Sequence, residues 1–124
     1  MAQLGYVTLG TNDLERASQF YEELLGTLGH TRIFDEDGFR AWGISMDQPA
    51  LSITKPFDGN AATVGNGVMV AMQMDSKEGV DAFYQQAMEL GATDEGAPGQ
   101  RGEGFYAGYF RDLDGNKLNA FVFA

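Results

Sequence analysis

An internal repeat constrains the fold of this chain more than any other feature of its sequence. Three features recur at one spacing, 63 residues further along the chain. They are Tyr6 and Met69, Asn12 and Asp75, and the aromatic pairs Phe20-Tyr21 and Phe83-Tyr84. Three features at one offset indicate a duplicated structural unit. The chain is therefore expected to contain two copies of one arrangement of strands and helices.

Each copy opens with a predicted strand that leads into a predicted helix. Residues 6–10 and 68–74 alternate in polarity, which is the period of a half-buried strand. Asn12 and Asp75 occupy the positions of helix caps, and a glutamate follows each of them three residues later. Apolar residues then recur at helical spacing until a glycine ends each pattern. The residues predicted to pack under the sheets are Leu14, Tyr21, Leu24, Phe83, Ala87 and Leu90.

Strands follow each helix. In the first copy, residues 31–34 and 39–46 flank a turn at 35–38, and a further strand covers 51–54. The second copy reads as a loose connection at 96–104, followed by a hairpin of 105–111 and 117–123 around an Asp-Gly turn. We predict an α+β fold of two tandem βαβββ modules, at about 1–57 and 67–124, within a single domain spanning 1–124. The Gly- and Asn-rich segment 56–67 connects them.

Composition excludes several classes of partner. The formal net charge is −10, with eight basic residues against eighteen acidic ones, which disfavours a nucleic-acid partner. The chain has no cysteine, so it forms no disulfide and uses no thiolate chemistry. Residues 1–10 have neither a basic start nor a long apolar run, which predicts a cytoplasmic protein without a membrane partner.

Several segments, taken in order and in duplicate, resemble the vicinal oxygen chelate superfamily of glyoxalases, bleomycin-resistance proteins and extradiol dioxygenases. The segments are Val7-Thr8-Leu9, Asn12 to Ala17, Phe20-Tyr21, Val80 to Phe83 with Gly91, and Arg111 to Asn116. The resemblance covers nearly the whole chain. It implies that the sheets of the two modules curl around one shared groove, and that the protein forms a homodimer.

The resemblance also implies a divalent metal, held by His on the first strand of a module and by Glu or Gln on its last. By position these ligands fall at Tyr6, Ser52, Met69 and Asn119. A phenol, a hydroxyl, a thioether and an amide provide no fixed anionic group to hold Mg, Mn, Zn or Fe. We therefore predict a groove without a metal and no cofactor.

Strand alternation selects the residues expected to line the groove. They are Tyr6, Thr8, Trp42, Ser52, Met69, Tyr106, Asn119 and Phe121. Aromatic walls with a few polar groups suit a planar organic ligand. The candidate catalytic residues are Tyr6 and Glu103, each as a proton-transfer group. The only histidine, His30, is interpreted as a residue at the end of the first helix.

Three functions remain open on the sequence alone. The first is a module that binds a small organic molecule in a metal-free groove, as the metal-free bleomycin-resistance proteins do. The second is an enzyme of glyoxalase or dioxygenase type whose metal centre is altered or absent. The third is a protein whose dimer surface is its functional part.

Overall fold

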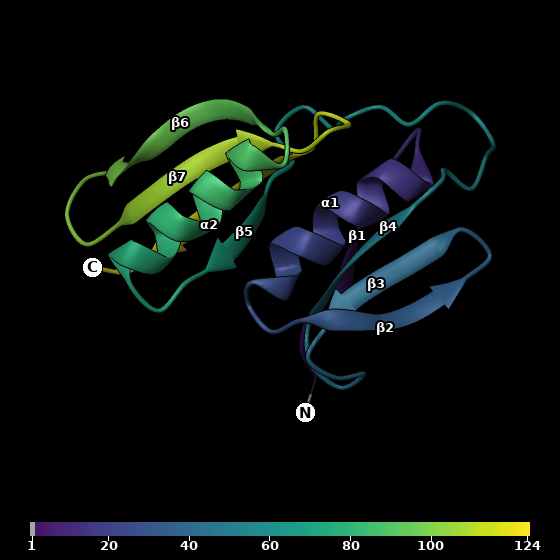
Figure 1. Ribbon diagram of the computed structural model, residues 1–124, viewed down its shortest axis with the longest axis horizontal. Coiled ribbons are helices and arrows are strands. Elements are labelled where there is room, and N and C mark those ends of the chain that lie inside the picture. Colours follow the sequence, from purple (N-terminus) through teal and green to yellow (C-terminus); the bar gives the residue numbers. More distant parts are fainter. Residues whose placement is uncertain (1) are drawn as a thin grey trace. The chain divides into compact units, whose positions relative to one another are not determined.

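The computed structural model describes residues 2–124. The chain divides into two compact units, Met1–Val64 (unit 1) and Gly65–Ala124 (unit 2). Each unit contains one four-stranded mixed sheet and one helix, so the predicted α+β fold with two tandem βαβββ modules is confirmed (Figure 1). Within residues 2–124, no helix is long and apolar enough to cross a membrane.

Unit 1 follows the order strand, helix and three strands. Its elements are β1 (Tyr6–Gly10), α1 (Leu14–Gly26), β2 (Thr31–Glu36), β3 (Phe39–Gly43) and β4 (Ala50–Thr54). The strands lie in the order β1-β4-β3-β2. The first strand runs parallel to β4, and the other neighbours are antiparallel.

Unit 2 repeats this topology. Its elements are β5 (Val70–Gln73), α2 (Lys77–Glu89), β6 (Thr93–Gln100), β7 (Tyr106–Arg111) and β8 (Lys117–Val122). The strands lie in the order β5-β8-β7-β6, and β5 is parallel to β8. Both helices contain 13 residues and start 63 positions apart, so the duplication seen in the sequence is a duplication of structure.

The two helices begin one residue later than the sequence predicts. The side chain of Asp13 caps α1 by accepting a hydrogen bond from the Arg16 amide, and Ser76 caps α2 in the same way. Asn12 instead holds the connecting segment against unit 1. Its Oδ1 accepts from the Ala62 amide at 2.7 Å, and its Nδ2 donates to the Ala62 carbonyl at 3.1 Å.

Both helices end in the same glycine-dependent turn. Gly29 and Gly91 have positive φ angles of 81° and 105°, a conformation that glycine adopts without steric cost. The amide of the following residue then reaches back five positions, from His30 to Leu25 and from Ala92 to Ala87. His30 thus has the helix-terminal position expected from the sequence. Partial burial lowers the pKa of its imidazole.

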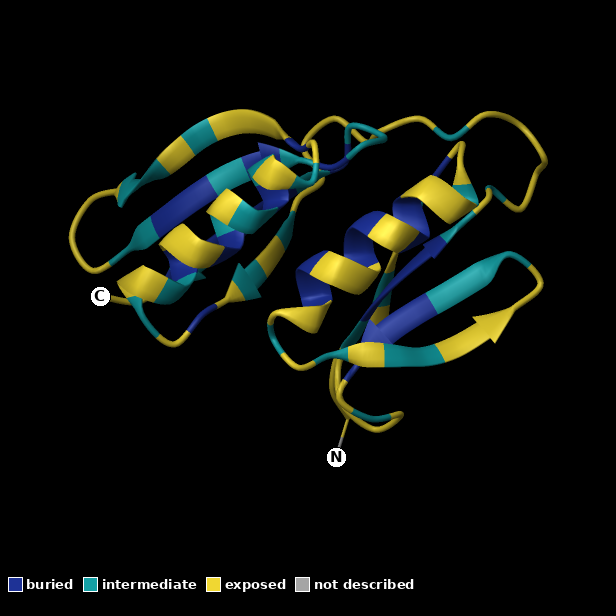
Figure 2. Cartoon of the chain, viewed as in Figure 1, coloured by how far each residue is buried: buried dark blue, intermediate teal, exposed yellow. Residues whose placement is uncertain are grey.

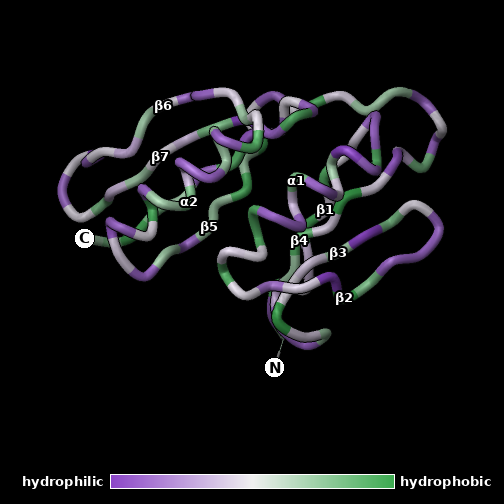
Figure 3. Tube along the Cα trace, viewed as in Figure 1, coloured by the Kyte–Doolittle hydropathy of each residue, from purple (hydrophilic) through white to green (hydrophobic). Residues whose placement is uncertain are grey.

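Each helix buries one side against its own sheet and exposes the other, and its hydropathy alternates accordingly (Figures 2 and 3). The core of unit 1 includes Phe20, Tyr21, Leu24, Trp42 and Ile53, and that of unit 2 includes Val80, Phe83, Ala87, Phe110 and Leu118. Of the six predicted core residues, Tyr21, Leu24, Phe83 and Ala87 are buried. Leu14 and Leu90, at the helix ends, are partly exposed.

Arg40 ties α1 to the edge of the unit 1 sheet. From β3, its guanidinium donates to Glu15 at 2.8 Å, to the Ser18 hydroxyl at 2.8 Å and to Asp35 at 3.1 Å. Hydrogen bonds from Arg32 and Arg40 hold the pKa of the Asp35 carboxyl below its ordinary value. These contacts place the Arg40 side of β3 on the helix-facing side of the sheet.

The segment 96–104 differs from its prediction as a loose connection, because residues up to Gln100 belong to β6. This strand pairs with β7 with two irregularities, one on each side of Gly96. Gly96 has a φ of 147°, which few residues other than glycine adopt. Two glycines and a proline within four residues give the sequence of a loop, and only pairing with β7 makes this segment a strand.

A phenol-carboxylate hydrogen bond joins α2 to β6. Tyr84 Oη donates to Asp94 Oδ1 at 2.7 Å, and the same oxygen accepts from the Gly96 amide at 2.9 Å. Burial, together with this hydrogen bond, raises the pKa of Tyr84 to about 12. The hydrogen bonds also lower the pKa of Asp94.

We expect Tyr84 to resist ionisation in an alkaline titration followed by phenolate absorbance. Because the folded state favours the neutral phenol, its contribution to stability is complete below pH 10 and is lost as the pH rises toward 12. Subtracting the titration of Tyr84→Phe isolates this residue. Asp94→Asn should lower the pKa only part of the way, since burial is the larger cause. An isolated Tyr84 titration centred near pH 10 would contradict this assignment.

Candidate functional site

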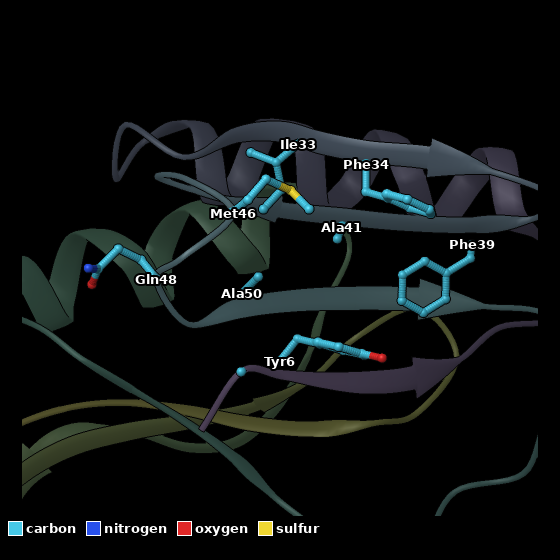
Figure 4. A pocket seen from close by; sticks show the side chains of 9 residues that line it. Tyr6, Ile33, Phe34, Phe39, Ala41, Met46, Gln48 and Ala50 are labelled. Carbon is cyan, nitrogen blue, oxygen red and sulfur yellow. The ribbon is translucent and has the colours of Figure 1, made fainter. Parts of the chain in front are cut away.

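The face of the unit 1 sheet opposite α1, here called helix-free face 1, contains a cavity of about 210 Å³ (Figure 4). The cavity opens over β1, β4, β3 and β2, with one wall from the loop after β3. Its lining residues are Gly5, Tyr6, Ile33, Phe34, Phe39, Ala41, Met46, Gln48 and Ala50. The polar side-chain groups among them are the amide of Gln48 and the hydroxyl of Tyr6.

Three aromatic rings, those of Tyr6, Phe34 and Phe39, line this cavity. The ring of Phe39 makes edge contacts with both Tyr6 and Phe34, at centroid distances of 5.9 and 5.6 Å. These contacts come from three different strands, so the sheet itself fixes their spacing. Tyr6 is nevertheless 61% exposed and Met46 is 73% exposed, which leaves apolar surface available to a ligand.

The polar residues predicted for this face, Thr8 and Ser52, bind each other. Their hydroxyl oxygens lie 2.8 Å apart on directly paired positions of β1 and β4. Ser52 is fully buried and donates to the Val7 carbonyl at 2.8 Å, so Thr8 is the donor to Ser52. The hydroxyl of Ser52 is therefore satisfied inside unit 1.

Helix-free face 2, the face of the unit 2 sheet opposite α2, has a different chemistry. Asn119 and Tyr109 are directly paired there, and Lys117 and Phe121 lie two positions away from Asn119 along β8. The Asn119 side chain is 1% exposed, and its Oδ1 accepts no hydrogen bond. A buried carbonyl oxygen without a partner is rare in folded proteins, because its desolvation is not compensated.

Trp42 lies on the opposite face from its predicted position in the groove. It is fully buried on the helix-facing side of β3, where its ring lies 6.2 Å from that of Tyr21. Its indole nitrogen donates to the carboxylate of Glu22 on α1. Since side chains alternate along β3, placing Phe39 and Ala41 on helix-free face 1 places Arg40 and Trp42 against the helix.

Tyr106 is also a helix-facing residue, in contrast to its expected place in the groove. Its hydroxyl donates to Asp81 on α2 at 2.7 Å. The ammonium of Lys77, also on α2, lies 5.4 Å from the centre of its ring. Tyr109, three positions further along β7, lies on helix-free face 2 instead. Side chains alternate along a strand, so two tyrosines three positions apart point to opposite faces of β7.

The remaining predicted site residues, Met69 and Glu103, lie outside the strands. Met69 immediately precedes β5 and is 41% exposed, and Glu103 is exposed in the loop between β6 and β7. The structure therefore brings together Tyr6, Thr8 and Ser52 in unit 1, and Asn119 and Phe121 in unit 2. Of the cavity residues, sequence reasoning selected Tyr6 and missed the other eight, which are Gly5, Ile33, Phe34, Phe39, Ala41, Met46, Gln48 and Ala50. The sequence signal for two of them was the pair of consecutive apolar residues Ile33 and Phe34.

A profile of the glyoxalase/bleomycin resistance protein/dioxygenase superfamily matches residues 3–120. The chain belongs to this superfamily. The chain is similar to a glyoxalase/bleomycin resistance protein from Albidiferax ferrireducens T118 whose crystal structure is known. The two sequences are 35% identical. Each chain covers 98% of the other, with a TM-score of 0.88. A search of curated proteins gave no match.

Two more distant solved structures share the fold. A glyoxalase/bleomycin resistance protein/dioxygenase family enzyme from Burkholderia phytofirmans PsJN is 20% identical, with a TM-score of 0.79 and coverage of 99% of this chain and 100% of that one. TnmS3, an antibiotic binding protein from Streptomyces sp. CB03234, is 19% identical. Its TM-score is 0.72, with coverage of 100% of this chain and 98% of that one.

The donor atoms of this superfamily member do not suit the divalent metal that the family resemblance implies. Ser52 uses its hydroxyl within unit 1, and Tyr6, Met69 and Asn119 supply a phenol, a thioether and an amide. Across residues 2–124, no three His, Cys, Asp or Glu side chains lie close enough together to hold a metal ion.

Elemental analysis of dialysed protein is therefore expected to find less than one divalent metal ion per chain. The physical reason is that no carboxylate or imidazole occupies the four positions where family ligands are expected. Retention of one metal per chain in the wild type, and its loss in Asn119→Ala or Tyr6→Phe, would contradict this prediction. Phe57→Ala, at a fully exposed position, is the control.

Proposed function

We propose that this superfamily member binds a small planar organic molecule, without a metal, in the cavity of helix-free face 1. The observation that carries the proposal is the apolar lining of that cavity, with three aromatic rings held by three strands. Apolar, concave sites with a few polar groups are typical of small-molecule binding. Tyr6 and Gln48 supply those polar groups at the cavity wall.

The cavity has room for one or two fused rings of a ligand. An apolar protein cavity of about 150 Å³ accommodates benzene, so a volume of about 210 Å³ leaves room for a slightly larger ring system. The opening toward solvent, marked by the exposed Tyr6 and Met46, allows a larger molecule to extend out of it. Binding would cover apolar surface that is otherwise exposed to water.

The superfamily relationship is compatible with this function but does not select it. TnmS3 is named for antibiotic binding, and at 19% identity it shares the fold with this chain and no more. Function within one fold depends on the residues of the site. Support for ligand binding therefore comes from the cavity of unit 1, and the choice between binding and catalysis is left to the experiment.

The test is calorimetric titration with 2-naphthol, a neutral two-ring probe. We expect saturable binding to the wild type, weakened at least tenfold in Ala50→Phe, because the new ring occupies the cavity. Phe57→Ala, whose ring is exposed outside the cavity, should bind like the wild type. Equal affinity in Ala50→Phe and wild type, with both folded by circular dichroism, would refute the proposed site. Chemical turnover of a bound probe would favour the enzyme instead.

We further propose that the chain forms a homodimer. The support is three exposed apolar side chains in unit 1, namely Leu4, Ile44 and Met46, at 65%, 68% and 73% exposure. Their two segments are joined by a hydrogen bond from the Gln3 side chain to the Asp47 carbonyl at 2.9 Å. Large exposed apolar residues that gather near one another mark interaction surfaces. Light scattering on the samples prepared for titration gives the mass directly.

A further inference from the structure

We propose a second binding site, on helix-free face 2, that takes the anionic group of a small aromatic molecule. Arg101 and Lys117 flank the ring of Tyr109 there, and their charges would hold a carboxylate or a sulfonate. All residues of this site belong to unit 2, so the proposal rests on other residues than the function proposed for unit 1.

Arg101 is held in place on this face by three contacts. Its backbone amide donates to the Phe105 carbonyl at 2.7 Å, which closes the loop between β6 and β7. Its guanidinium donates from Nη2 to the Ala97 carbonyl at 2.7 Å and lies 5.5 Å from the centre of the Tyr109 ring. A guanidinium has five N–H donors, and one such bond leaves the others for a ligand.

Two glycines of β6 make room for this guanidinium. A Cβ atom on Gly99 would lie 2.9 Å from Arg101 Nη1, and one on Gly96 would lie 3.3 Å from Nη2. Larger residues at these positions would displace the Arg101 side chain. The absence of a side chain at Gly96 and at Gly99 therefore leaves room for the Arg101 guanidinium against Tyr109.

Lys117 supplies the second positive charge. Its ammonium lies 5.5 Å from the centre of the same Tyr109 ring, from the neighbouring strand β8. Within the described part of the chain, neither Lys117 nor Arg101 has a carboxylate oxygen within 4.0 Å. Arg111, by contrast, is paired with Glu95 at 3.4 Å. Two cations without anionic partners, in a chain of net charge −10, point to an external anion.

Asn119 provides an independent indication that this face receives a polar group. It is directly paired with Tyr109 and two positions from Lys117 on the same face. Its side chain is almost fully buried, and its Oδ1 has no hydrogen-bond partner. A ligand with an O–H or N–H next to its acid group would satisfy this oxygen.

The other end of the face is aromatic. The ring of Phe121 stacks on that of Phe105 at a centroid distance of 5.4 Å, and both are partly exposed. Lys117 and Phe121 are four residues apart along β8, or about 13 Å at strand spacing. An acidic group at Tyr109 and a flat ring toward Phe121 therefore fit one small molecule, which identifies the ligand class as an aromatic acid.

The experiment compares three probes of one shape by calorimetry at 0.15 M salt, where the net negative charge of the chain is largely screened. The probes are 2-naphthoate, its neutral methyl ester and 2-naphthylmethylammonium. We expect 2-naphthoate to bind most tightly. In Arg101→Gln/Lys117→Gln its affinity should fall roughly ten- to a hundredfold, because charge-assisted hydrogen bonds are lost. Ester binding should be unchanged.

Two further variants separate this site from the other possibilities. Gly99→Ala leaves both charges in the chain but displaces the guanidinium, and it should also weaken 2-naphthoate binding. Arg16→Gln removes an exposed positive charge in unit 1 and should have no effect. Ala50→Phe should not remove the preference for the acid over the ester. Equal binding of acid and ester by the wild type, or unchanged acid binding by the folded double variant, would overturn the proposal.

Discussion

Replacing Phe83 with Ala is expected to lower the free energy of unfolding by about 3–5 kcal/mol, the usual cost of removing a buried aromatic side chain. Phe83 is 2% exposed on the sheet-facing side of α2, and its ring lies 6.2 Å from that of Phe110 on β7. The sheet holds Phe110 in place, so the space left by Phe83 would remain largely empty. Urea unfolding followed by circular dichroism measures the effect.

Phe57→Ala is the matched control, because it removes the same side chain from a fully exposed position in the connecting segment. Its effect should remain within about 0.5 kcal/mol, as for most surface substitutions. A loss below about 1 kcal/mol for Phe83→Ala would mean that α2 does not pack on its sheet through this face.

Replacing Trp42 with Ala is expected to cost unit 1 about 3–5 kcal/mol as well. The indole is fully buried, lies 6.2 Å from the Tyr21 ring and supports the guanidinium of Arg32 at 5.5 Å. Its removal leaves a cavity and also deprives the Glu22 carboxylate of its indole donor. Because Trp42 is the only tryptophan, unfolding of Trp42→Ala is followed by circular dichroism, and unfolding of the wild type is followed by circular dichroism and by fluorescence.

Trp42→Phe separates the two contributions, since it keeps an aromatic ring and removes the N–H donor. We expect a loss of about 1–2 kcal/mol, smaller than that of Trp42→Ala. If both variants were as stable as the wild type, Trp42 would not lie between β3 and α1. Since Trp42 faces away from the cavity, 2-naphthol should change its emission little.

The repeated modules could be predicted from the sequence, because the strand and helix periods both occur twice at one spacing. Facing was harder to predict on β3, where both sides carry large apolar residues. Phe39 and Trp42 look equivalent in the sequence, and the contacts of Arg40 with Glu15 and of Trp42 with Glu22 on α1 show which side meets the helix. The choice between Tyr106 and Tyr109 depended in the same way on a distant partner, Asp81.

The cavity itself lay beyond sequence reasoning for a geometric reason. The pairing of β2 with β3 shifts register between Arg32 and Phe34, so Ile33 and Phe34 both reach the cavity although they are consecutive. Strict alternation assigns such neighbours to opposite faces. Met46 and Gln48 enter from a loop, where no periodic pattern exists.

The pairing of Thr8 with Ser52 in unit 1 differs chemically from the corresponding pairing in unit 2. There the paired positions are Ala71 and Asn119, and Ala71 lies 63 residues after Thr8. The methyl group of Ala71 cannot donate a hydrogen bond, so it does not provide a partner for the Oδ1 atom of Asn119. The paired hydroxyl groups of unit 1 thus satisfy each other, whereas the corresponding pair in unit 2 leaves one buried carbonyl oxygen without a hydrogen-bond donor.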